Sequence, residues 1–517
     1  MDRIYLVNHF LENSAQQYPD QMAAWFQDQF MNYSEMNHQA NKLANHLIHL
    51  GIKRGDRIAL LFDNSFHYII SYFAILKAGC VVVALNTDIQ SESIIYQLNN
   101  SECIAMVAQK KYLRYLPEIL VKTPHLIHLI VDSNTPGPLS EIGHIQNHNL
   151  EDILKTGSIE APQVRNIDID LAAIVYTSGS TGTPKGVMLS HLNLVSNMYS
   201  IVDYLSLKQS DSIMVVLPFF YIYGMSLLLT HFLVGAKVLI DNRFMYPNKV
   251  LESMKELGAT GFAGVPSTFT ILLNRSSLAE MDFPKLRYVT QAGGAMAVST
   301  QKRVAEAFAP AELFIMYGST EAAPRLSWMD PKRLTDKWGS IGKAVPNVDL
   351  FIGDEEGNPL PQGTEGELLA RGSNMFQGYW HDLDTTEEVY SKGLYRSGDL
   401  GYMDDEGFLF ITGRKKDIIK VKGYRVSAKE IEEYCLEIKE VHEAAAIGVD
   451  DPLLGEAIKL YIVPRENTQL DLDAITLFLN QKLPAYKRPK EIEVISNLPK
   501  NKAGKIMKTI LKERNKK

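Results

Sequence analysis

A chain of 517 residues exceeds what one hydrophobic core usually supports, so we expect two or more domains. The composition is that of a folded globular protein, with 46% hydrophobic residues, 22% charged residues and a formal net charge of −7. These values exclude a disordered chain and give no overall attraction to nucleic acid. Cys80, Cys103 and Cys435 have no paired spacing, which argues against a disulfide framework or a zinc site and fits a reducing compartment.

The N-terminal segment carries charge from its second residue and lacks an apolar run of signal-peptide length, so we expect a cytoplasmic location. Residues 213–236 run for about the thickness of a bilayer without Asp, Glu, Lys or Arg. However, Pro218 and Gly224 interrupt this stretch near its start, and Thr230 and His231 interrupt it later. The pattern therefore predicts a buried strand, a turn and a buried helix, and no transmembrane segment.

Along the first four hundred or so residues, helical patterns alternate with short apolar runs, which predicts parallel α/β layers. The runs are RIALLF, CVVVAL, AMVAQ, HLIHLIV, AAIVYT, IMVVLP, AKVLI, FAGVP and LRYVTQAG. From about Asp349 the segments VDLFIGDEEGNPL, GELLARG and GYMDDEGFLFITGR, with Gly-containing turns, predict antiparallel hairpins. The charged turn TGRKKD and a smaller α+β stretch follow. We place a domain boundary there, which gives an N-terminal domain of residues 1–414 and a C-terminal domain of residues 415–517.

The charge is distributed unevenly along the chain. From Lys482 to the end, twelve Lys or Arg residues oppose three Glu residues, so the remainder carries about −16. A basic tail usually covers a solvated surface or touches nucleic acid nonspecifically. Because Tyr486 is the only aromatic residue within it, we expect no nucleic-acid binding. The alternative interpretation is a cationic small domain that faces a polyphosphate ligand.

The stretch YTSGSTGTPKGVMLSH, from Tyr176 to His191, directly follows an apolar run. Its glycines let backbone N–H groups crowd around an anion, its hydroxyl groups add donors, and Lys185 adds positive charge. The stretch therefore predicts a polyphosphate site, with a flexible linker as the alternative. The common phosphate loop Gly-x-x-x-x-Gly-Lys-Ser/Thr is absent, because Pro184 lies five residues after Gly179 and a glycine follows Lys185.

Five further motifs follow this loop along the chain. They are QAGGAM at 291–296, YGSTEAAP at 317–324, YRSGDLGYMDDEGFLFITGR at 395–414, KVKGYRVSAKEIE at 420–432 and LPKNKAGKI at 498–506. Each motif alone could be a polar loop or a solvated turn. In this order and spacing, the chain resembles the adenylate-forming superfamily, which includes acyl-CoA synthetases, luciferases and the adenylation domains of peptide synthetases. The resemblance extends over nearly the whole chain.

The resemblance implies an α/β multidomain fold. A large N-terminal domain would contain two α/β lobes and a β-barrel, and a small, mobile α+β C-terminal domain would pivot on a hinge. It also implies a reaction in two halves: a carboxylate attacks the α-phosphorus of ATP to give an acyl-adenylate and pyrophosphate, and a thiol then displaces AMP. Because the carboxylate and the triphosphate are both anionic, positive charge has to converge on the α-phosphate. The implied cofactors are ATP and Mg²⁺, with CoA or a phosphopantetheinyl carrier protein as acceptor.

The resemblance also assigns residues to ATP. The loop from Thr177 to Lys185 would wrap the β- and γ-phosphates, Asp399 and Arg414 would contact the ribose, and residues 294–296 with Tyr317 would bracket the adenine. The full ATP set is Thr177, Ser178, Gly179, Ser180, Thr181, Gly182, Thr183, Lys185, Gly294, Ala295, Met296, Tyr317, Gly318, Ser319, Thr320, Asp399, Arg414 and Lys505.

Catalytic roles fall to Thr320, Glu321, Arg425 and Lys505. Thr320 and Glu321 match the contacts to the α-phosphate and to Mg²⁺, and Glu321 is the expected metal ligand. Lys505 matches the lysine that bridges the substrate carboxylate and the α-phosphate. Since Lys505 belongs to the small domain, that domain has to close for adenylation. For the thiol step it should swing and bring the segment with Gly423 to the thiol tunnel, with Lys416 as the hinge.

The predicted acyl pocket departs from the family pattern at one position. Tyr221 stands where many CoA ligases carry histidine and amino-acid-activating domains carry aspartate. Without a carboxylate there, a substrate ammonium has no evident partner, which disfavours an α-amino acid. The apolar wall at 262–266 favours an uncharged acyl tail. The residues assigned to this pocket are Tyr221, Met225, Gly264, Gln291 and Gly293.

We therefore expect an AMP-forming acid–thiol ligase that acts on a small carboxylic acid, with CoA as the favoured acceptor. One alternative is a stand-alone adenylation enzyme that loads an acyl, amino or imino acid, such as a proline-like acid, onto a separate carrier protein. A second alternative, from another class, is an ATP-binding protein without catalysis. The presence of Lys505, Glu321 and Asp399 disfavours this last alternative.

Overall fold

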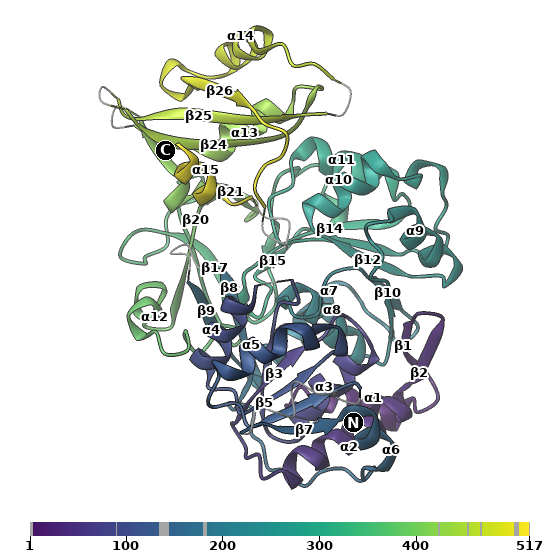
Figure 1. The fold of residues 1–517 in the computed structure, drawn as a ribbon. Coiled ribbons are helices and arrows are strands. Elements are labelled where there is room, and N and C mark those ends of the chain that lie inside the picture. The colour runs from purple at the N-terminus through teal and green to yellow at the C-terminus, as the bar shows by residue number, and fades with distance from the viewer. Residues whose placement is uncertain are drawn as a thin grey trace.

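The computed structural model describes residues 4–88, 90–133, 144–178, 183–421, 424–451, 454–465, 468–500 and 506–515. Within these residues the chain forms two α/β lobes, an antiparallel β unit and a smaller C-terminal α+β unit (Figure 1). This architecture confirms the predicted fold class. The antiparallel β unit occupies the place in the chain where a β-barrel was expected.

The first lobe is built on a seven-stranded sheet that is parallel except where β8 pairs with β9. In sheet order the strands are β7 (Gln146–Asn149), β6 (His128–Val131), β5 (Ala105–Ala108), β3 (Arg57–Leu61), β4 (Val81–Ala84), β8 (Leu171–Ser178) and β9 (Pro184–Ser190). The helices of this part of the chain are α1 (His9–Gln17), α2 (Tyr33–His49), α3 (Phe66–Lys77), α4 (Ser91–Ser101), α5 (Leu116–Val121) and α6 (Leu150–Thr156). Strands β4, β5 and β6 are buried along their whole length, as expected of parallel strands covered on both faces.

The second lobe is built on a nine-stranded sheet with a parallel centre and antiparallel edges. In sheet order the strands are β16 (Lys343–Ala344), β15 (Ser327–Trp328), β14 (Glu312–Tyr317), β13 (Tyr288–Gln291), β12 (Gly261–Gly264), β10 (Ser212–Val215), β11 (Lys237–Ile240), β1 (Met22–Phe26) and β2 (Gln29–Asn32). Its helices are α7 (His191–Tyr204), α8 (Ile222–Leu233), α9 (Pro247–Glu256), α10 (Pro266–Arg275) and α11 (Val298–Ala307). The start of the chain thus supplies the last two strands at one end of this sheet, in a lobe built mostly from residues after 190.

The apolar stretch at 213–236 folds as predicted, into β10, a turn and α8. Every residue of α8 from Tyr223 to Phe232 is buried. Gly224 is required by close packing, because a Cβ atom there would lie 2.0 Å from the carbonyl oxygen of Pro218. Within the described parts of the chain, no helix combines the length and the apolar character needed to cross a bilayer.

The antiparallel unit and the C-terminal unit complete the fold. The antiparallel unit contains β17 (Val348–Gly353), β18 (Gly366–Gly372), β19 (Tyr390–Ser391), β20 (Leu394–Met403), β21 (Leu409–Arg414) and α12 (Leu383–Val389). The predicted hairpins are confirmed, since β17 pairs antiparallel with β18 and β20 with β21. The C-terminal unit contains β22 (Ile418–Val421), β23 (Tyr424–Ser427), β24 (Val441–Asp451), β25 (Gly455–Pro464), β26 (Glu491–Val494), α13 (Ala428–Leu436), α14 (Leu472–Lys482) and α15 (Lys508–Arg514).

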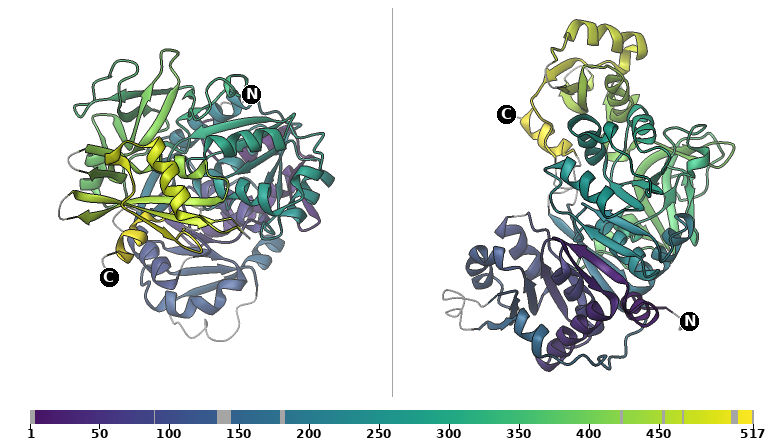
Figure 2. Two further views of the ribbon diagram at one scale, coloured as in Figure 1. Left: turned by 90° about the horizontal axis from the view of Figure 1, so that it is seen from above. Right: turned by 90° about the vertical axis from the view of Figure 1, so that its right-hand side faces the viewer.

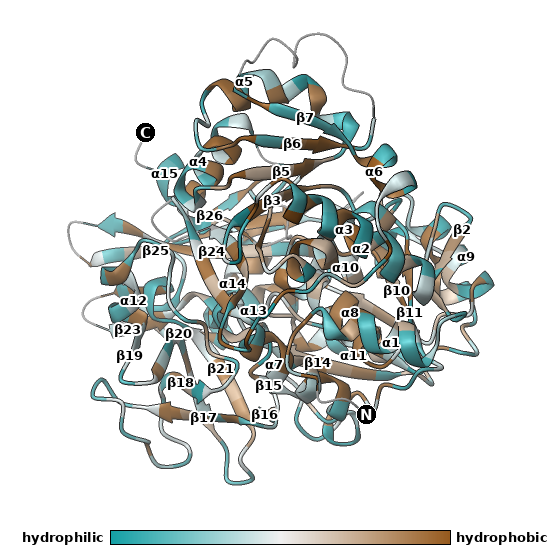
Figure 3. Ribbon diagram, turned by 90° about the horizontal axis from the view of Figure 1, so that it is seen from below, coloured by the Kyte–Doolittle hydropathy of each residue, from teal (hydrophilic) through white to brown (hydrophobic). Residues whose placement is uncertain are grey.

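The C-terminal unit has its own buried core and stands beyond the end of the second lobe (Figure 2). Burial and the charge of Arg465, in the C-terminal unit, both lower the pKa of Arg303 on α11, so the two side chains lie near each other. In the first lobe, strands β3, β5 and β6 are predominantly hydrophobic along their length (Figure 3). These strands therefore form a buried hydrophobic core, and binding residues are expected in the loops that leave the sheets.

Candidate functional site

Three neighbouring parallel strands of the second lobe end at one edge of its sheet, and the candidate site lies there. Strand β12 ends at Gly264, β13 at Gln291 and β14 at Tyr317. Ligands of α/β proteins bind outside the carboxyl ends of parallel strands, where the connecting loops leave the sheet. All three residues were predicted to contact the acid or ATP, and the fold brings them to the same edge.

The predicted phosphate loop joins two antiparallel strands. Strand β8 ends at Ser178 and β9 begins at Pro184, with Thr177 opposite Lys185 in the register. A conventional phosphate loop joins a strand to a helix, so this hairpin is a different structure and agrees with the missing motif. Thr183 is exposed at the end of the hairpin. The remaining predicted residues of the loop, Gly179, Ser180, Thr181 and Gly182, lie outside the described residues.

Lys185 is connected to Glu321 through Tyr379, which the sequence analysis did not identify. The Nζ atom of Lys185 donates to Thr385 Oγ1 at 2.9 Å and lies 5.4 Å from the centre of the Tyr379 ring. The Tyr379 hydroxyl donates to Glu321 Oε1 at 2.7 Å. Burial and the Glu321 charge both raise the pKa of Tyr379, so this hydroxyl remains a donor. Asp382, 3.7 Å from Lys185 Nζ, balances the lysine charge.

Asp399 is the centre of a second polar cluster. Strands β20 and β21 place Asp399 opposite Arg414 in register, and Arg414 Nε donates to Asp399 Oδ1 at 2.7 Å. The Tyr317 hydroxyl donates to the other carboxylate oxygen of Asp399, which is only 4% exposed. Burial is the largest single influence on the pKa of Arg414 and acts to lower it. The charge and hydrogen bond of Asp399, together with Tyr317 and Asp417, nevertheless raise the pKa overall. The residues predicted to contact ribose and adenine therefore meet at one point.

The segment after β14 folds back against the end of that strand. A Cβ atom at Gly318 would lie 1.9 Å from the carbonyl oxygen of Pro324, so only glycine fits there. The single-turn helix η4 (Thr320–Ala322) carries the predicted α-phosphate and metal contacts. The hydroxyl of Ser319 lies 3.1 Å from the hydroxyl of Tyr395, so the segment is also tied to β20.

The loop after β13 carries the other residues predicted to contact adenine. Gly294 and Ala295 are exposed, whereas Met296 is buried and belongs to the core of the second lobe. The buried amide of Gln291 donates to the carbonyl oxygen of Gly294 at 2.9 Å. Gly293 adopts a φ of +83°, which favours glycine. Gln291, predicted to line the acyl pocket, is thus engaged in holding the adenine loop.

The start of α8 supplies the other predicted acyl-pocket residues. Tyr221 is the N-cap residue of α8, and its hydroxyl accepts a hydrogen bond from Asn86 Nδ2 at 3.2 Å. Burial and the Asp88 charge raise the pKa of Tyr221 to about 12, so its side chain is neutral. Met225 is 2% exposed, and its sulfur accepts from the Tyr72 hydroxyl at 3.2 Å in the core between α3 and α8. Tyr221 therefore stands at the edge of the site, while Met225 is directed into the core.

Four further predicted residues lie wholly or partly beyond what the structure describes. Gly423 and Lys505 lie outside the described residues. Only the backbone placement of Ser178 and Arg425 is described; in the β22–β23 pair, Arg425 is opposite Lys420. The proposed roles of these residues are unchanged by the structure.

Lys416 stands at the junction between the antiparallel unit and the C-terminal unit. It is an exposed residue of the 3-10 turn η6 (Lys415–Asp417), between the end of β21 and the start of β22. Desolvation and the charge of Arg414 lower the pKa of Lys416, although the carboxylate of Asp399 acts in the opposite direction. The predicted hinge therefore borders the predicted ribose contacts.

Much of the positive charge after residue 481 is balanced within the C-terminal unit. The pairs are Lys482 with Glu437, Lys487 with Glu430, Lys490 with Asp451, Lys500 with Glu443, Lys508 with Glu432 and Arg514 with Glu493. The number of Lys and Arg residues after residue 481 is therefore larger than the number of unpaired positive charges there.

Two family profiles match the chain. The profile of the AMP-binding enzyme covers residues 11–380, and that of the AMP-binding enzyme C-terminal domain covers residues 430–505. Together they span both the lobes and the C-terminal unit.

Similar proteins match along the whole length. A long-chain-fatty-acid–CoA ligase of Salmonella typhimurium is 32% identical, over 99% of this chain and 95% of the relative. An oxalate–CoA ligase of Arabidopsis thaliana is 30% identical, over 97% of each chain. Among solved structures, ATP-bound MatB from Rhodopseudomonas palustris superposes with a TM-score of 0.88 at 27% identity, over 99% of both chains. The similarity thus includes every part of the chain that contributes to the candidate site.

Proposed function

The chain belongs to the family of AMP-binding enzymes and is an AMP-forming acyl-CoA ligase, and from this premise we propose that it makes an acyl-adenylate and transfers the acyl group to CoA. In the first half, an acid oxygen bonds to the α-phosphorus of ATP while the bond to pyrophosphate breaks. In the second, the thiolate sulfur attacks the acyl carbon and AMP leaves. The adenylate is needed because a carboxylate is a poor electrophile and AMP is a good leaving group.

The convergence of Tyr317, Asp399 and Arg414 beside Glu321 carries this proposal. In it, the buried Asp399 accepts the ribose hydroxyls, and Arg414 fixes the carboxylate in place. Lys185 and the hydroxyl groups of its hairpin hold the departing pyrophosphate, and residues 318–320 face the α-phosphate. Fixed donors and charges of this kind stabilise a phosphoryl-transfer transition state without reorganisation.

Glu321 is the proposed protein ligand for Mg²⁺. One of its oxygen atoms accepts from Tyr379, which leaves lone pairs of the carboxylate for a cation. Mg²⁺ in nucleotide sites is usually bound by one or two carboxylates together with phosphate oxygens and water, and a single carboxylate beside a phosphate hairpin fits that donor set. When bound, the ion would neutralise charge that develops on the phosphates.

We propose that the C-terminal domain begins at residue 415 and moves on Lys416. In that scheme Lys505 bridges the acid and the α-phosphate when the domain is closed, with Arg425 adding positive charge. Gly423 would line the thiol tunnel after the domain swings. The separate sheets on the two sides of residues 415–417 support this division.

The identity of the acid has to come from the site rather than from overall similarity. The two curated relatives are named for different acids, a long-chain fatty acid and oxalate, at nearly equal identity. CoA is the proposed acceptor because both relatives are named as CoA ligases, and a separate carrier protein is the alternative acceptor. The three cysteines are free and buried, which suits the reducing cytoplasm proposed as its location.

Acid-dependent ATP–pyrophosphate exchange tests the proposal. With a panel of carboxylic acids and MgATP, at least one acid should support exchange, and CoA should then yield acyl-CoA and AMP in equal amounts. Glu321→Gln, in which exchange should be strongly reduced, serves as the control. If the wild-type protein exchanges with no acid, the ligase assignment fails; if it exchanges but acylates only a carrier protein, CoA is the wrong acceptor.

A further inference from the structure

Arg325 is a buried guanidinium without an acidic partner. The residue is 2% exposed, and its Nε atom has no hydrogen-bond partner. Among the residues that the structure describes, no carboxylate forms an ion pair with it. Burying a charge without a partner costs several kcal/mol in effective terms, so such residues are expected only where something else is gained.

The main chain of Arg325 is held firmly in place. The side chain of Asn197 accepts from the Arg325 N–H at 2.9 Å and donates to the Arg325 carbonyl at 2.8 Å. Asn374 Nδ2 donates to the same carbonyl at 2.9 Å. The next residue, Leu326, donates its N–H to the Tyr317 carbonyl at 3.0 Å. Arg325 is therefore fixed directly beside the strand end that carries the predicted adenine contact.

The guanidinium lies among buried aromatic side chains near the start of α8, the helix that carries predicted acyl-pocket residues. Its carbon atom is 5.2 Å from the centre of the Tyr223 ring, and Tyr223 follows Tyr221 by two residues at the start of α8. The Tyr223 hydroxyl donates to the carbonyl oxygen of Thr290, the neighbour of Gln291 at the end of β13. The ring offsets part of the desolvation of the cation, but it cannot satisfy the Nε–H donor.

We propose that Arg325 binds a second carboxylate on the acid that the enzyme activates, so that the substrate is a short dicarboxylic acid. This inference rests on the proposed ligase function. Arginine binds carboxylates through two parallel N–H donors, which would supply both the missing charge and the missing acceptor for Nε. Because Arg325 follows the turn η4, which carries the predicted α-phosphate contact Thr320, by only a few residues, we expect the second carboxylate to lie close to the reacting one, which limits the length of the acid.

This substrate class differs from the uncharged acyl tail expected from the sequence. That expectation rested on the apolar residues at 262–266. Arg325 directly follows the motif YGSTEAAP, but nothing in the sequence indicates that its side chain is buried. Its flexible side chain can turn toward an acid while Asn197 and Asn374 keep its main chain fixed.

The test compares matched acids in pyrophosphate exchange. Dicarboxylic acids of two to eight carbons are paired with monocarboxylic acids of equal length and with the monomethyl esters of the same diacids. The wild-type protein should prefer a diacid over both partners at least tenfold in kcat/KM. Arg325→Leu should lower the diacid value about a hundredfold and leave or raise that of the monoacid, and Arg325→Lys should fall between them. Arg371→Leu, at an exposed arginine on β18, is the matched control.

Different results separate the two proposals. If the wild-type protein prefers monoacids, or if Arg325→Leu and Arg325→Lys lose activity equally on every acid, the second-carboxylate inference is wrong while the ligase function stands. If no acid of any class supports exchange, the ligase function fails, and this inference fails with it. A reversed preference in Arg325→Leu with unchanged KM for ATP would establish the inference, since a residue needed only for folding would affect all acids alike.

Discussion

At the scale of single residues, the most informative contact is the hydrogen bond from Tyr379 to Glu321. It fixes one oxygen of the carboxylate proposed to hold Mg²⁺ and links that carboxylate to the environment of Lys185. A hydrogen bond to a charged group contributes about 1.5–3 kcal/mol. Tyr379 is thus a positioning residue for the carboxylate proposed to hold the metal.

Tyr379→Phe should therefore lower kcat/KM for MgATP about 10- to 100-fold, while Glu321→Gln should lose more and also require a higher Mg²⁺ concentration. Pyrophosphate exchange measured across a Mg²⁺ titration separates the two effects. Tyr402→Phe, whose ring stacks on Phe410, is the control and should be unchanged. A Tyr379→Phe variant with wild-type kinetics would show that the hydrogen bond does not serve the metal site.

Some contacts of the site follow from the sequence motifs, and others do not. Asp399 and Arg414 lie in one motif, and their direct contact follows from the antiparallel hairpin predicted there. Tyr379 and Arg325 could not be assigned from sequence, because their roles come from contacts with residues far along the chain. For Arg325 these are Asn197 and Tyr223, which lie more than a hundred residues earlier.

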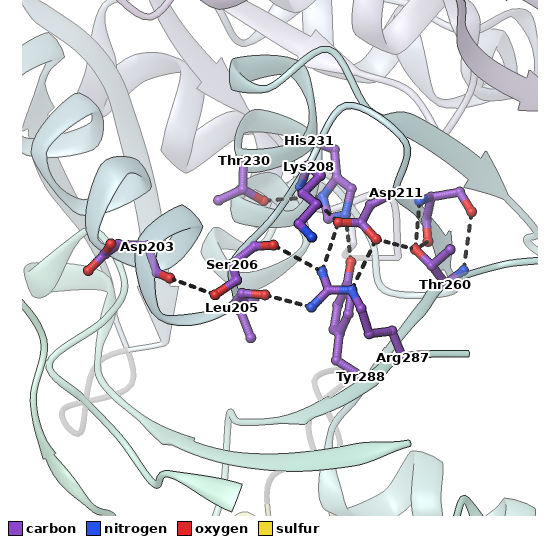
Figure 4. A network of polar contacts seen from close by, with 11 residues as sticks. Asp203, Leu205, Ser206, Lys208, Asp211, Thr230, His231, Thr260, Arg287 and Tyr288 are labelled. Atoms are coloured by element: carbon purple, nitrogen blue, oxygen red, sulfur yellow. Dashed lines mark hydrogen bonds and ion pairs between the residues drawn. The ribbon is translucent and has the colours of Figure 1, made fainter. Parts of the chain in front are cut away.

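At the scale of elements, helices α7 and α8 each carry a buried histidine that must remain neutral. His231 on α8 donates from Nδ1 to the Leu227 carbonyl at 2.8 Å, because a carbonyl can only accept. Its Nε2 atom therefore accepts from the Tyr288 hydroxyl, also at 2.8 Å. Figure 4 shows this contact beside the Asp211–Arg287 ion pair at the amino ends of the strands. Protonation of Nε2 would force this hydrogen bond to reverse and would place an imidazolium charge in the core.

His191, the first residue of α7, is neutral for a similar reason. Its Nδ1 atom accepts from the Val7 N–H at 3.0 Å, so that atom cannot carry a proton. Burial is the main cause that lowers the pKa of both His191 and His231, in each case to about 4. The two residues connect α7 to the N-terminal segment and α8 to β13.

These two histidines predict a loss of stability in mild acid. The unfolded chain protonates them near pH 6.5 and the folded chain only near pH 4, so their contribution is complete above 6.5 and is lost as the pH falls toward 4. Each should contribute on the order of 3 kcal/mol at neutral pH. Urea unfolding at pH 7, 5.5 and 4.5 should show a smaller acid loss in His231→Gln than in the wild type. Equal losses in both proteins would contradict the prediction. His38→Gln, at an exposed histidine of α2, is the control.

The elements themselves were largely predictable from local pattern. Each of the nine apolar runs contains or overlaps a strand, and the stretch at 213–236 divides into β10 and α8 as expected. The pairing of β1 with β11, in which Ala24 lies opposite Val238, was not predictable. Apolar periodicity identifies a strand, but the choice of its neighbour depends on packing across the whole molecule.

At the scale of the whole molecule, the central question is how the C-terminal unit acts on the site. The chain before and after residues 501–505 pairs with itself, through a β-bridge between Lys500 and Ile506 and a hydrogen bond from the Met507 N–H to the Pro499 carbonyl at 2.8 Å. Lys500 also pairs with Glu443 on β24. Lys508 pairs with the buried Glu432 of α13 at 2.7 Å. The order of motifs predicted two domains, but the anchoring of this segment required contacts that no motif encodes. The described residues on either side of 501–505 are therefore held by the C-terminal unit.

This attachment makes the two half-reactions separable by one substitution. If Lys505 stabilises charge only at the α-phosphate, it affects only the adenylation step, because a group used in one transition state changes only that rate. Lys505→Ala should then lower pyrophosphate exchange at least a thousandfold. Thioester formation from supplied acyl-adenylate should change less than about fivefold. Stopped-flow or quenched measurement of each half-reaction provides the comparison, with Lys512→Ala on α15 of the same unit as the control. A similar loss in both half-reactions would mean that one arrangement of the domains serves both steps. Loss of the first step alone would instead require the C-terminal unit to leave the α-phosphate before the thiol attacks, which places the conformational change between the two chemical steps.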